Sequence, residues 1–394
     1  MIKIEHPELV DIVADFSTAV EKKFIRNANI ALYVIDLLQE KNEIALQDIT
    51  GKGVKLHISA LKLICSIDKL LDSKKTANKE TNDLVYTLNK LKIKGDKRSK
   101  CRKTKRINEL KNRIKYLIQF IQSNDLFNAK PKDLLILNAT LNKKMQASSK
   151  RLYDYFFDYQ KYYDELNNGI GKRLDLKCCP YCNRNYITYI PDVNKRIIGP
   201  SYDHFFSKTD YKYLTLSFYN LIPSCNICNS NLKGKIDFKL EFYMHPYLNG
   251  FDEDVNFDFD LDSKKFDDKK VISFKPTINI SKDISQTKEK QIIGSDPNNK
   301  KNKEGNLNVF KLREVYESHS DTVQEIYVRL DKNSIHYVGS INKIIEKLGT
   351  SESEFYRYHF RNYFDTKDFN KRPLSKLNKD IYLKMKEISE LTLE

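Results

Sequence analysis

The chain has 394 residues, enough for two or three domains with buried cores. It carries 69 lysines and arginines against 53 aspartates and glutamates, a formal net charge of +16, which favours nucleic acid or an anionic membrane surface as a partner. We expect a cytoplasmic protein, because the N-terminal MIKIEHPELV is unlike a signal peptide and no apolar run approaches the roughly 18 residues that span a bilayer.

Residues 1–170 are expected to form a mainly helical region. Apolar side chains recur at spacings of three and four in residues 8–24 and 57–71, and the same period resumes over 107–122. Residues 151–166 are rich in aromatic side chains at helical spacing, which indicates core packing rather than a surface on which bases stack.

A strongly basic run separates two of these helical stretches. Nine of the residues from Lys92 to Arg106 are lysine or arginine, and one is aspartate. Either the run is a solvated loop, or it is an arm that contacts a nucleic-acid backbone. The second interpretation makes candidates of six side chains: Lys97, Arg98, Arg102, Lys103, Lys105 and Arg106.

Five of the seven cysteines lie within 51 residues of one another. Cys179 and Cys182 are separated by two residues, and Cys225 and Cys228 repeat that spacing. An odd cysteine count and a reducing compartment argue against a disulfide framework. Two such pairs supply four thiolates, which suits a tetrahedral structural Zn²⁺. Cys178 leaves a one-residue shift open, although it lacks the two-residue gap to Cys182.

Polar residues suited to catalysis lie between the two cysteine pairs. Asp203 directly precedes His204, and Asn220 follows His204 by sixteen positions. Asn229 comes nine positions after Asn220, and Lys233 comes four positions after Asn229. Taken singly, such residues are ordinary turn or surface residues, so the motif depends on their joint spacing and on the flanking cysteines.

This spacing resembles the HNH endonuclease motif in its D-H…N…N form, which C-x-x-C pairs flank in many bacterial members. In that family a β-hairpin followed by a helix grips one divalent metal. Apolar runs at 186–190 and 196–198 predict strands, and the stretch after Cys228 is helix-competent. The resemblance implies an α+β fold, in which a zinc-stapled ββα-metal module over residues 171–250 lies between the helical region and a mixed region over 251–394.

The resemblance also assigns a role to each polar residue. His204 would be the general base, because a neutral imidazole takes a proton from water near pH 7. Asp203 and Asn229 would give oxygen ligands to Mg²⁺ or Mn²⁺, Asn229 standing where the family name has its last histidine. Asn220 would hold the loop that orients His204. The zinc would be structural.

Two lysines follow the motif. Lys233 stands where some members keep a further histidine. We expect Lys233 and Lys235 to contact the backbone of the nucleic acid.

The region after the motif mixes strands and helices. Apolar and acidic residues alternate over 255–262, which predicts a half-buried strand with an acidic outer face, and 271–280 is its expected partner. Residues 294–306 form a polar loop, and helices follow. His245 either approaches the metal centre or belongs to a capped turn before Pro246.

Several short runs are similar to bacterial anti-phage HNH proteins of the Septu and retron-associated kind (PtuB-type nucleases). These runs are CPYCNR, DHFFSK, YNLIPSCNICNS, HPY and KRPLSKLNKDI. The similarity implies a nuclease that works beside an SMC- or ABC-like ATPase of the PtuA type. The chain itself has no P-loop, so we expect any nucleotide-driven step to come from such a partner.

The sequence therefore favours metal-dependent hydrolysis of nucleic acid, DNA before RNA, in anti-phage defence. An RNA endonuclease acting on tRNA, for example, remains an alternative, and self-association stays open. A non-catalytic zinc module that binds nucleic acid or a protein would also explain the cysteines. It gives no reason for the spacing of Asp203, His204, Asn220 and Asn229.

Overall fold

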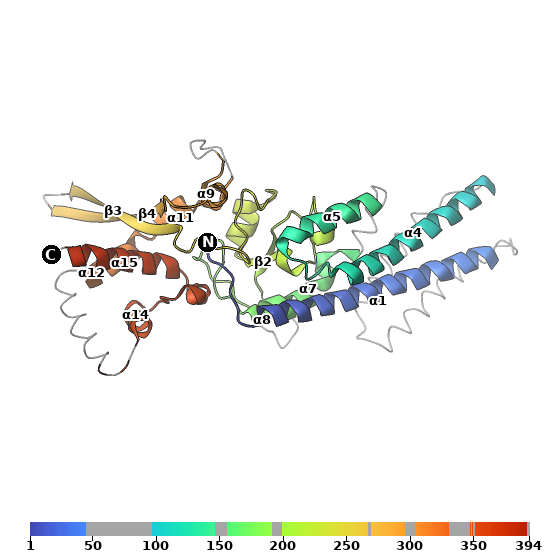
Figure 1. Cartoon of the computed structure of the whole chain (residues 1–394), viewed down its shortest axis with the longest axis horizontal. Helices are drawn as coiled ribbons and strands as arrows, with labels where there is room; N and C mark the ends of the chain where they lie inside the picture. Colours follow the sequence, from blue (N-terminus) through green and yellow to red (C-terminus); the bar gives the residue numbers. More distant parts are fainter. Residues whose placement is uncertain are drawn as a thin grey trace. The chain divides into compact units, whose positions relative to one another are not determined.

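A computed structural model describes residues 1–44, 97–145, 156–190, 199–266, 269–295, 304–330, 347, 349 and 351–391. The chain divides into two compact units. The first unit holds Met1–Phe16, Tyr163–Tyr211 and Phe218–Glu394, and the second holds Ser17–Tyr162 and Lys212–Ser217. The fold is α+β, as predicted, with helices and two small antiparallel sheets (Figure 1).

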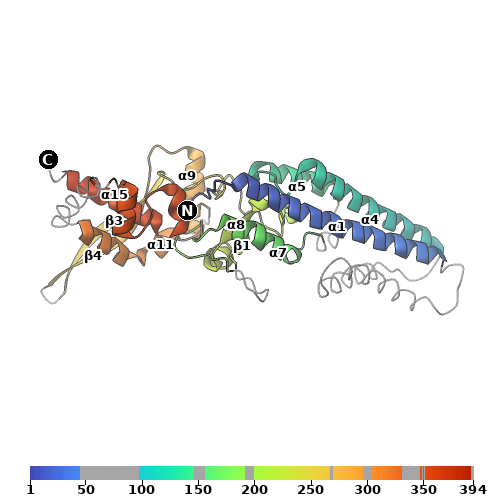
Figure 2. The same cartoon turned by 90° about the horizontal axis from the view of Figure 1, so that it is seen from below.

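Long helices dominate the second unit. Helices α1 (Leu9–Ile44) and α4 (Lys97–Asn124) lie side by side in Figures 1 and 2, and Lys111 of α4 pairs with Asp36 of α1. Helix α5 (Pro131–Met145) and the short turns η2 (Tyr159–Tyr162) and η4 (Lys212–Leu214) complete the unit. The apolar period of α1 is buried as expected, at Val20, Phe24, Ala28, Ala31 and Ile35.

Aromatic side chains form the core of this unit. Phe24 packs against Phe127, Phe156 and Phe157, with ring centroids 5.2–5.9 Å apart. The expectation that the aromatic-rich stretch packs in a core is confirmed for its described part. The expected helix at residues 57–71 lies outside the described residues.

The structure contradicts the interpretation of the basic run as a loop, for the part of the run that it describes. Residues 97–106 form the first turns of α4, so they are helix and not loop. Residues 92–96 and the side chains of the six candidate lysines and arginines lie outside what the structure describes.

The first unit contains both sheets. Strands β1 (Ser201–His204) and β2 (Leu221–Ser224) pair antiparallel, with His204 opposite Leu221. Strands β3 (Val255–Phe266) and β4 (Lys269–Ile280) form a longer hairpin, with Val255 opposite Ile280, where the alternating pattern predicts it.

Helices pack against the longer hairpin. Helix α15 (Ser375–Leu391) lies against β3, α11 (Leu312–Glu317) lies against β4, and α12 (Ser320–Leu330) contacts both β4 and α15 (Figure 1). The remaining short elements of this unit are α7 (Tyr163–Leu166), η3 (Asn167–Gly171), α8 (Lys172–Leu174), η5 (Phe218–Asn220), η6 (Ile227–Lys233), α9 (Gln286–Ile293), α10 (Asn306–Val309), α14 (Glu352–Phe360) and η7 (Thr366–Lys371).

The strand expected at 186–190 does not form. Tyr186 makes a single bridge to Cys178, and the backbone amides of Cys179 and Ile187 close a tight loop onto Asn185 and Lys177. This stretch is therefore the return limb of the first cysteine loop, and Ile190 is exposed. The expected strand at 196–198 falls outside the described residues.

No described helix combines the length and the apolar character needed to cross a bilayer.

Candidate functional site

The two cysteine pairs converge in the folded chain. The sulfur atoms of Cys179, Cys182, Cys225 and Cys228 all lie within 4.8 Å of one another, and all four residues are buried. Four convergent thiols are the donor set of a structural zinc site. Cys178 is not in this group, so the cluster has the register that the two-residue spacing predicts.

Local backbone turns place each cysteine. The Asn183 amide bonds back to the carbonyl of Cys179, and Asn183 itself takes a left-handed conformation with φ of 49°. Cys225 directly follows β2, and Cys228 is the second residue of η6. The sulfur of Cys225 accepts from the side-chain amide of Asn185 at 3.3 Å. Neutral donors of this kind are typical around metal-bound thiolates.

The cluster's own electrostatics favour a bound cation. Thiol contacts from Cys179, Cys182 and Cys228 lower the pKa of Cys225, while burial raises the pKa of Cys179. Without a cation the four groups must therefore share protons. A divalent metal removes that conflict by letting all four ionise.

His204 ends strand β1, and Asn220 fixes the chain directly after it. The Asn220 side chain accepts from the Phe206 amide at 2.7 Å and donates to the Phe206 carbonyl at 3.3 Å. The Asn220 carbonyl also accepts from the Phe205 amide. Asn220 is fully buried, whereas His204 is 8% exposed. Asn220 thus holds the backbone of the two residues that follow His204.

Asp203 is buried among protein partners. Its Oδ2 accepts from the Tyr181 hydroxyl at 2.6 Å, and its Oδ1 lies 3.0 Å from Lys233 Nζ. Lys233 Nζ also donates to the His204 carbonyl at 2.7 Å. Burial and the neighbouring Asp203 carboxylate raise the pKa of Tyr181 well above its usual value, which keeps the hydroxyl a donor.

These contacts change the expected role of Lys233. Lys233 is 3% exposed, so it cannot reach a nucleic-acid phosphate as predicted. Its ammonium group is needed inside the protein, beside the Asp203 carboxylate. Lys235 is exposed and stays a candidate for such a contact.

The expected Mg²⁺ or Mn²⁺ ligands fit this arrangement poorly. Both Asp203 oxygens already have partners, one of them a cation. Asn229 is half-buried on η6, which packs against β1, so its side chain is the more available of the two. Among the described residues, the cysteine tetrad is the one group of three or more His, Cys, Asp and Glu side chains with convergent ligand atoms.

His245 packs directly beside the β1–β2 loop. Its ring lies 4.3 Å from that of Phe205 between centroids, and its Nδ1 accepts from the Tyr247 amide at 3.3 Å. Burial lowers the pKa of His245 to about 3, so this imidazole stays neutral. The turn before Pro246 is present, because the Leu248 amide bonds to the His245 carbonyl.

The sequence did not single out Tyr181. It occupies a spacer position between two cysteines of the tetrad, and nothing local pairs it with an aspartate 22 residues away. The available signal was its size, because a tyrosine inside a tight cysteine loop must pack or bond somewhere specific.

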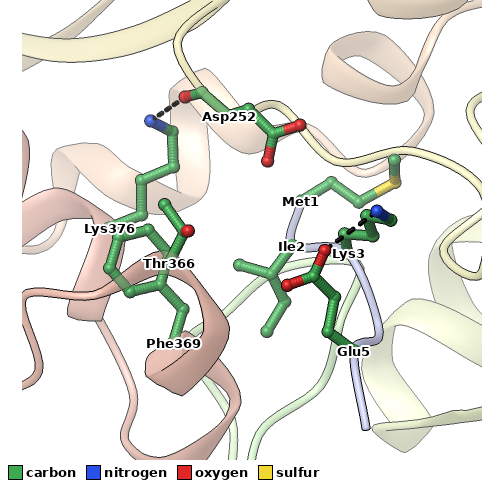
Figure 3. Close-up of a pocket in the computed structure, with 8 residues that line it drawn as sticks. All are labelled: Met1, Ile2, Lys3, Glu5, Asp252, Thr366, Phe369 and Lys376. Carbon is green, nitrogen blue, oxygen red and sulfur yellow. Dashed lines mark hydrogen bonds and ion pairs between the residues drawn. The ribbon is translucent and has the colours of Figure 1, made fainter. Parts of the chain in front are cut away.

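A small pocket in the same unit lies apart from these residues. Figure 3 shows it between the N-terminal segment and the C-terminal elements, where Lys376 Nζ donates to the Asp252 carbonyl at 2.6 Å. Lys376 also pairs with Asp380 at 3.0 Å, and both side chains are buried. None of the predicted site residues lines this pocket. Lys3 pairs with Glu5 and Lys376 bonds to Asp252, so these charged groups of the pocket stabilise the packing of its two sides.

Comparison with known proteins gives one partial match. The protein ea31 of Escherichia phage lambda is 27% identical over 129 residues, which cover 32% of this chain and 37% of the phage protein. The chain therefore spans little more than a third of that relative. No family model matches the sequence, and no solved structure matches the fold.

Proposed function

We propose that the chain is an HNH-type endonuclease that hydrolyses nucleic-acid phosphodiesters, with His204 as the general base. The observation that carries the proposal is the Asn220 amide, which clamps the backbone of Phe206 two residues after His204. The order of β1, β2 and η6, with cysteines at both ends, supports it, because it matches the order expected of a ββα module.

The chemistry of the chain's own residues suits this reaction. A neutral imidazole at the end of β1 is able to remove a proton from the attacking water. The bonds from Asn220 already fix the loop after His204. Less conformational entropy is therefore lost when the substrate binds. In the family a divalent cation stabilises charge at phosphorus, but Asp203 does not present a free carboxylate for it. We therefore assign no step to that ion.

The proposed substrate is DNA, and the proposed role is anti-phage defence with an SMC- or ABC-like ATPase as partner. The net charge of +16 and the exposed Lys235 support a polyanionic substrate without distinguishing DNA from RNA. A zinc module that binds nucleic acid without cutting it is the second candidate. The engagement of Asp203 by Lys233 favours it, because one expected metal ligand is lost.

A cleavage screen tests the proposal. Purified protein is incubated with supercoiled plasmid and with total RNA, in Mg²⁺, in Mn²⁺ and in EDTA. We expect nicked or linear plasmid with at least one metal and intact plasmid with His204→Ala. The matched control is His6→Ala, because His6 lies outside the β1–β2 module and its Nδ1 accepts from the nearby Glu8 amide. Binding of both nucleic acids without cleavage of either, in all three conditions, would favour the non-catalytic module.

A further inference from the structure

The residues Tyr181, Asp203 and Lys233 form a buried positioning unit for His204, and we propose that Asp203 serves this unit instead of ligating a catalytic metal. The inference rests on the proposed function for the role of His204. In the HNH family the aspartate before the histidine is expected to bind the divalent ion, and Asp203 differs in this respect.

Both carboxylate oxygens of Asp203 already contact buried groups of the protein. Tyr181 donates to Oδ2 at 2.6 Å, and the Lys233 ammonium lies 3.0 Å from Oδ1. The side chains of Asp203 and Lys233 are 3% and 2% exposed. An ion pair this deeply buried is costly to separate, because each charge then loses its only compensation. A divalent ion on Oδ1 would lie beside the Lys233 ammonium, and the repulsion between these two cations in a buried site disfavours metal binding there.

Lys233 also joins two consecutive residues of β1. Its Nζ contacts the Asp203 carboxylate and donates to the His204 carbonyl at 2.7 Å. The same ammonium lies 4.8 Å from the centre of the Phe238 ring. An ammonium has three protons to donate, and these contacts give each a partner. Lys233, the last residue of η6, thereby fixes the end of β1. Asn220 fixes the loop that follows β1.

The positioning unit is connected to the cysteine tetrad through the chain. Tyr181 lies between the ligands Cys179 and Cys182, and its ring stacks on Phe310 at 4.4 Å between centroids. Lys233 ends η6, the element that carries Cys228. Both partners of Asp203 thus come from segments that hold cysteines of the tetrad. Asp203 is therefore connected through its two partners to both cysteine-bearing segments.

A charge-deletion cycle tests the inference in the full chain. Lys233→Met leaves a buried carboxylate without a cation, so we expect the Tm to fall by about 5–15 °C. Adding Asp203→Asn removes the orphaned charge, so the double variant should regain most of that loss. Zinc content is measured for each variant by elemental analysis, so that loss of metal is not mistaken for loss of the pair.

Mn²⁺ binding without substrate decides the role of Asp203. We expect the Asp203→Asn/Lys233→Met double variant to bind Mn²⁺ within about threefold of the wild-type half-saturation, by electron paramagnetic resonance. Absence of Mn²⁺ binding by the wild type would agree equally with an aspartate that ligates no metal. A half-saturation raised tenfold or more in a double variant of restored stability and full zinc content would overturn the inference.

Tyr181→Phe tests positioning, because it removes one hydrogen bond and keeps the ring. In an active enzyme we expect kcat to fall about tenfold with KM and zinc content unchanged. An unchanged kcat would contradict a positioning role. If the wild type cuts no nucleic acid, the proposed function fails, while the stability cycle and the Mn²⁺ measurement still decide how Asp203 is used.

Discussion

Single side chains hold the backbone that follows His204 at the end of β1. Asn220 uses both ends of its amide on the backbone of Phe206, and His245 fills the space beside Phe205. Buried polar groups of this kind are costly to unpair, so each substitution should have a measurable effect.

Asn220→Ala should destabilise the module and reduce cleavage together. It leaves the amide and carbonyl of Phe206 without their partner, a loss of about 1–3 kcal/mol in the free energy of unfolding. Urea unfolding and single-turnover cleavage measure the two effects. The control is Asn226→Ala in the same module, because Asn226 is exposed and should change neither. Normal cleavage by Asn220→Ala would remove the argument for loop positioning.

His245 should make stability depend on acid pH. Its pKa is about 3 in the folded chain against an ordinary 6.5, so the unfolded chain binds a proton more readily. The stability from neutral His245 is complete above about pH 6.5 and is lost as the pH falls towards 3, at about 1.4 kcal/mol per pH unit.

His245→Phe should flatten this acid dependence. Urea unfolding at a series of pH values compares the variant with the wild type, and zinc loss at low pH affects both proteins. Equal slopes for the two proteins between pH 6 and pH 4 would contradict the burial of a neutral imidazole.

At the scale of elements, the cysteine loop, β1–β2 and η6 depend on one another. The sequence was sufficient to predict which four cysteines form the tetrad, because the two-residue spacing within each pair is a local property of a turn. The strand predicted at 186–190 does not form, and the described strands of the module lie later, at Ser201–His204 and Leu221–Ser224. Tyr186–Ile190 has strand-like residues, but its backbone pairs with the first cysteine loop.

Long-range contacts account for what the sequence could not show. β1 pairs with residues some twenty positions later, and that pairing depends on the Asn220 clamp and on the cysteines. Lys233 follows a polar stretch and precedes a glycine, which is typical of an exposed lysine. Its burial depends on Asp203, thirty positions earlier, so no local pattern reports it.

The zinc site should show its register in two single substitutions. We expect one tightly bound Zn²⁺ per chain as purified, by elemental analysis, and resistance to brief EDTA treatment. Cys179→Ser should release the zinc and destabilise the module, whereas Cys178→Ser should keep full occupancy. Soluble, folded protein without zinc would contradict the site, and loss of zinc in Cys178→Ser alone would contradict the register.

At the scale of the whole molecule, the basic charge and the amount of chain outside the cysteine module matter. A net charge of +16 favours contact with nucleic acid, and the proposed ATPase partner would offer one way to restrain the proposed nuclease. The flanking regions either grip substrate or contact such a partner. These two roles differ in their response to salt.

Contacts with nucleic acid should weaken steeply as salt rises. Counterion release predicts a loss of about 10³-fold in affinity between roughly 50 and 200 mM salt, whereas a partner interface with an apolar core should persist. We expect the chain to co-purify at high salt with the product of a neighbouring ATPase gene and to cut weakly alone. Vigorous cutting by the isolated chain, with no effect of that gene on host toxicity, would contradict a partner role.

We propose above all that His204, which ends β1, acts as a general base, while Asn220 holds the loop that follows it. The most direct measurement is the single-turnover rate of plasmid cleavage by wild type and by His204→Ala, with Tm and zinc content recorded for both. We predict a fall of about 10²- to 10⁴-fold at unchanged zinc content. A His204→Ala variant that cuts within a fewfold of the wild-type rate would contradict the account.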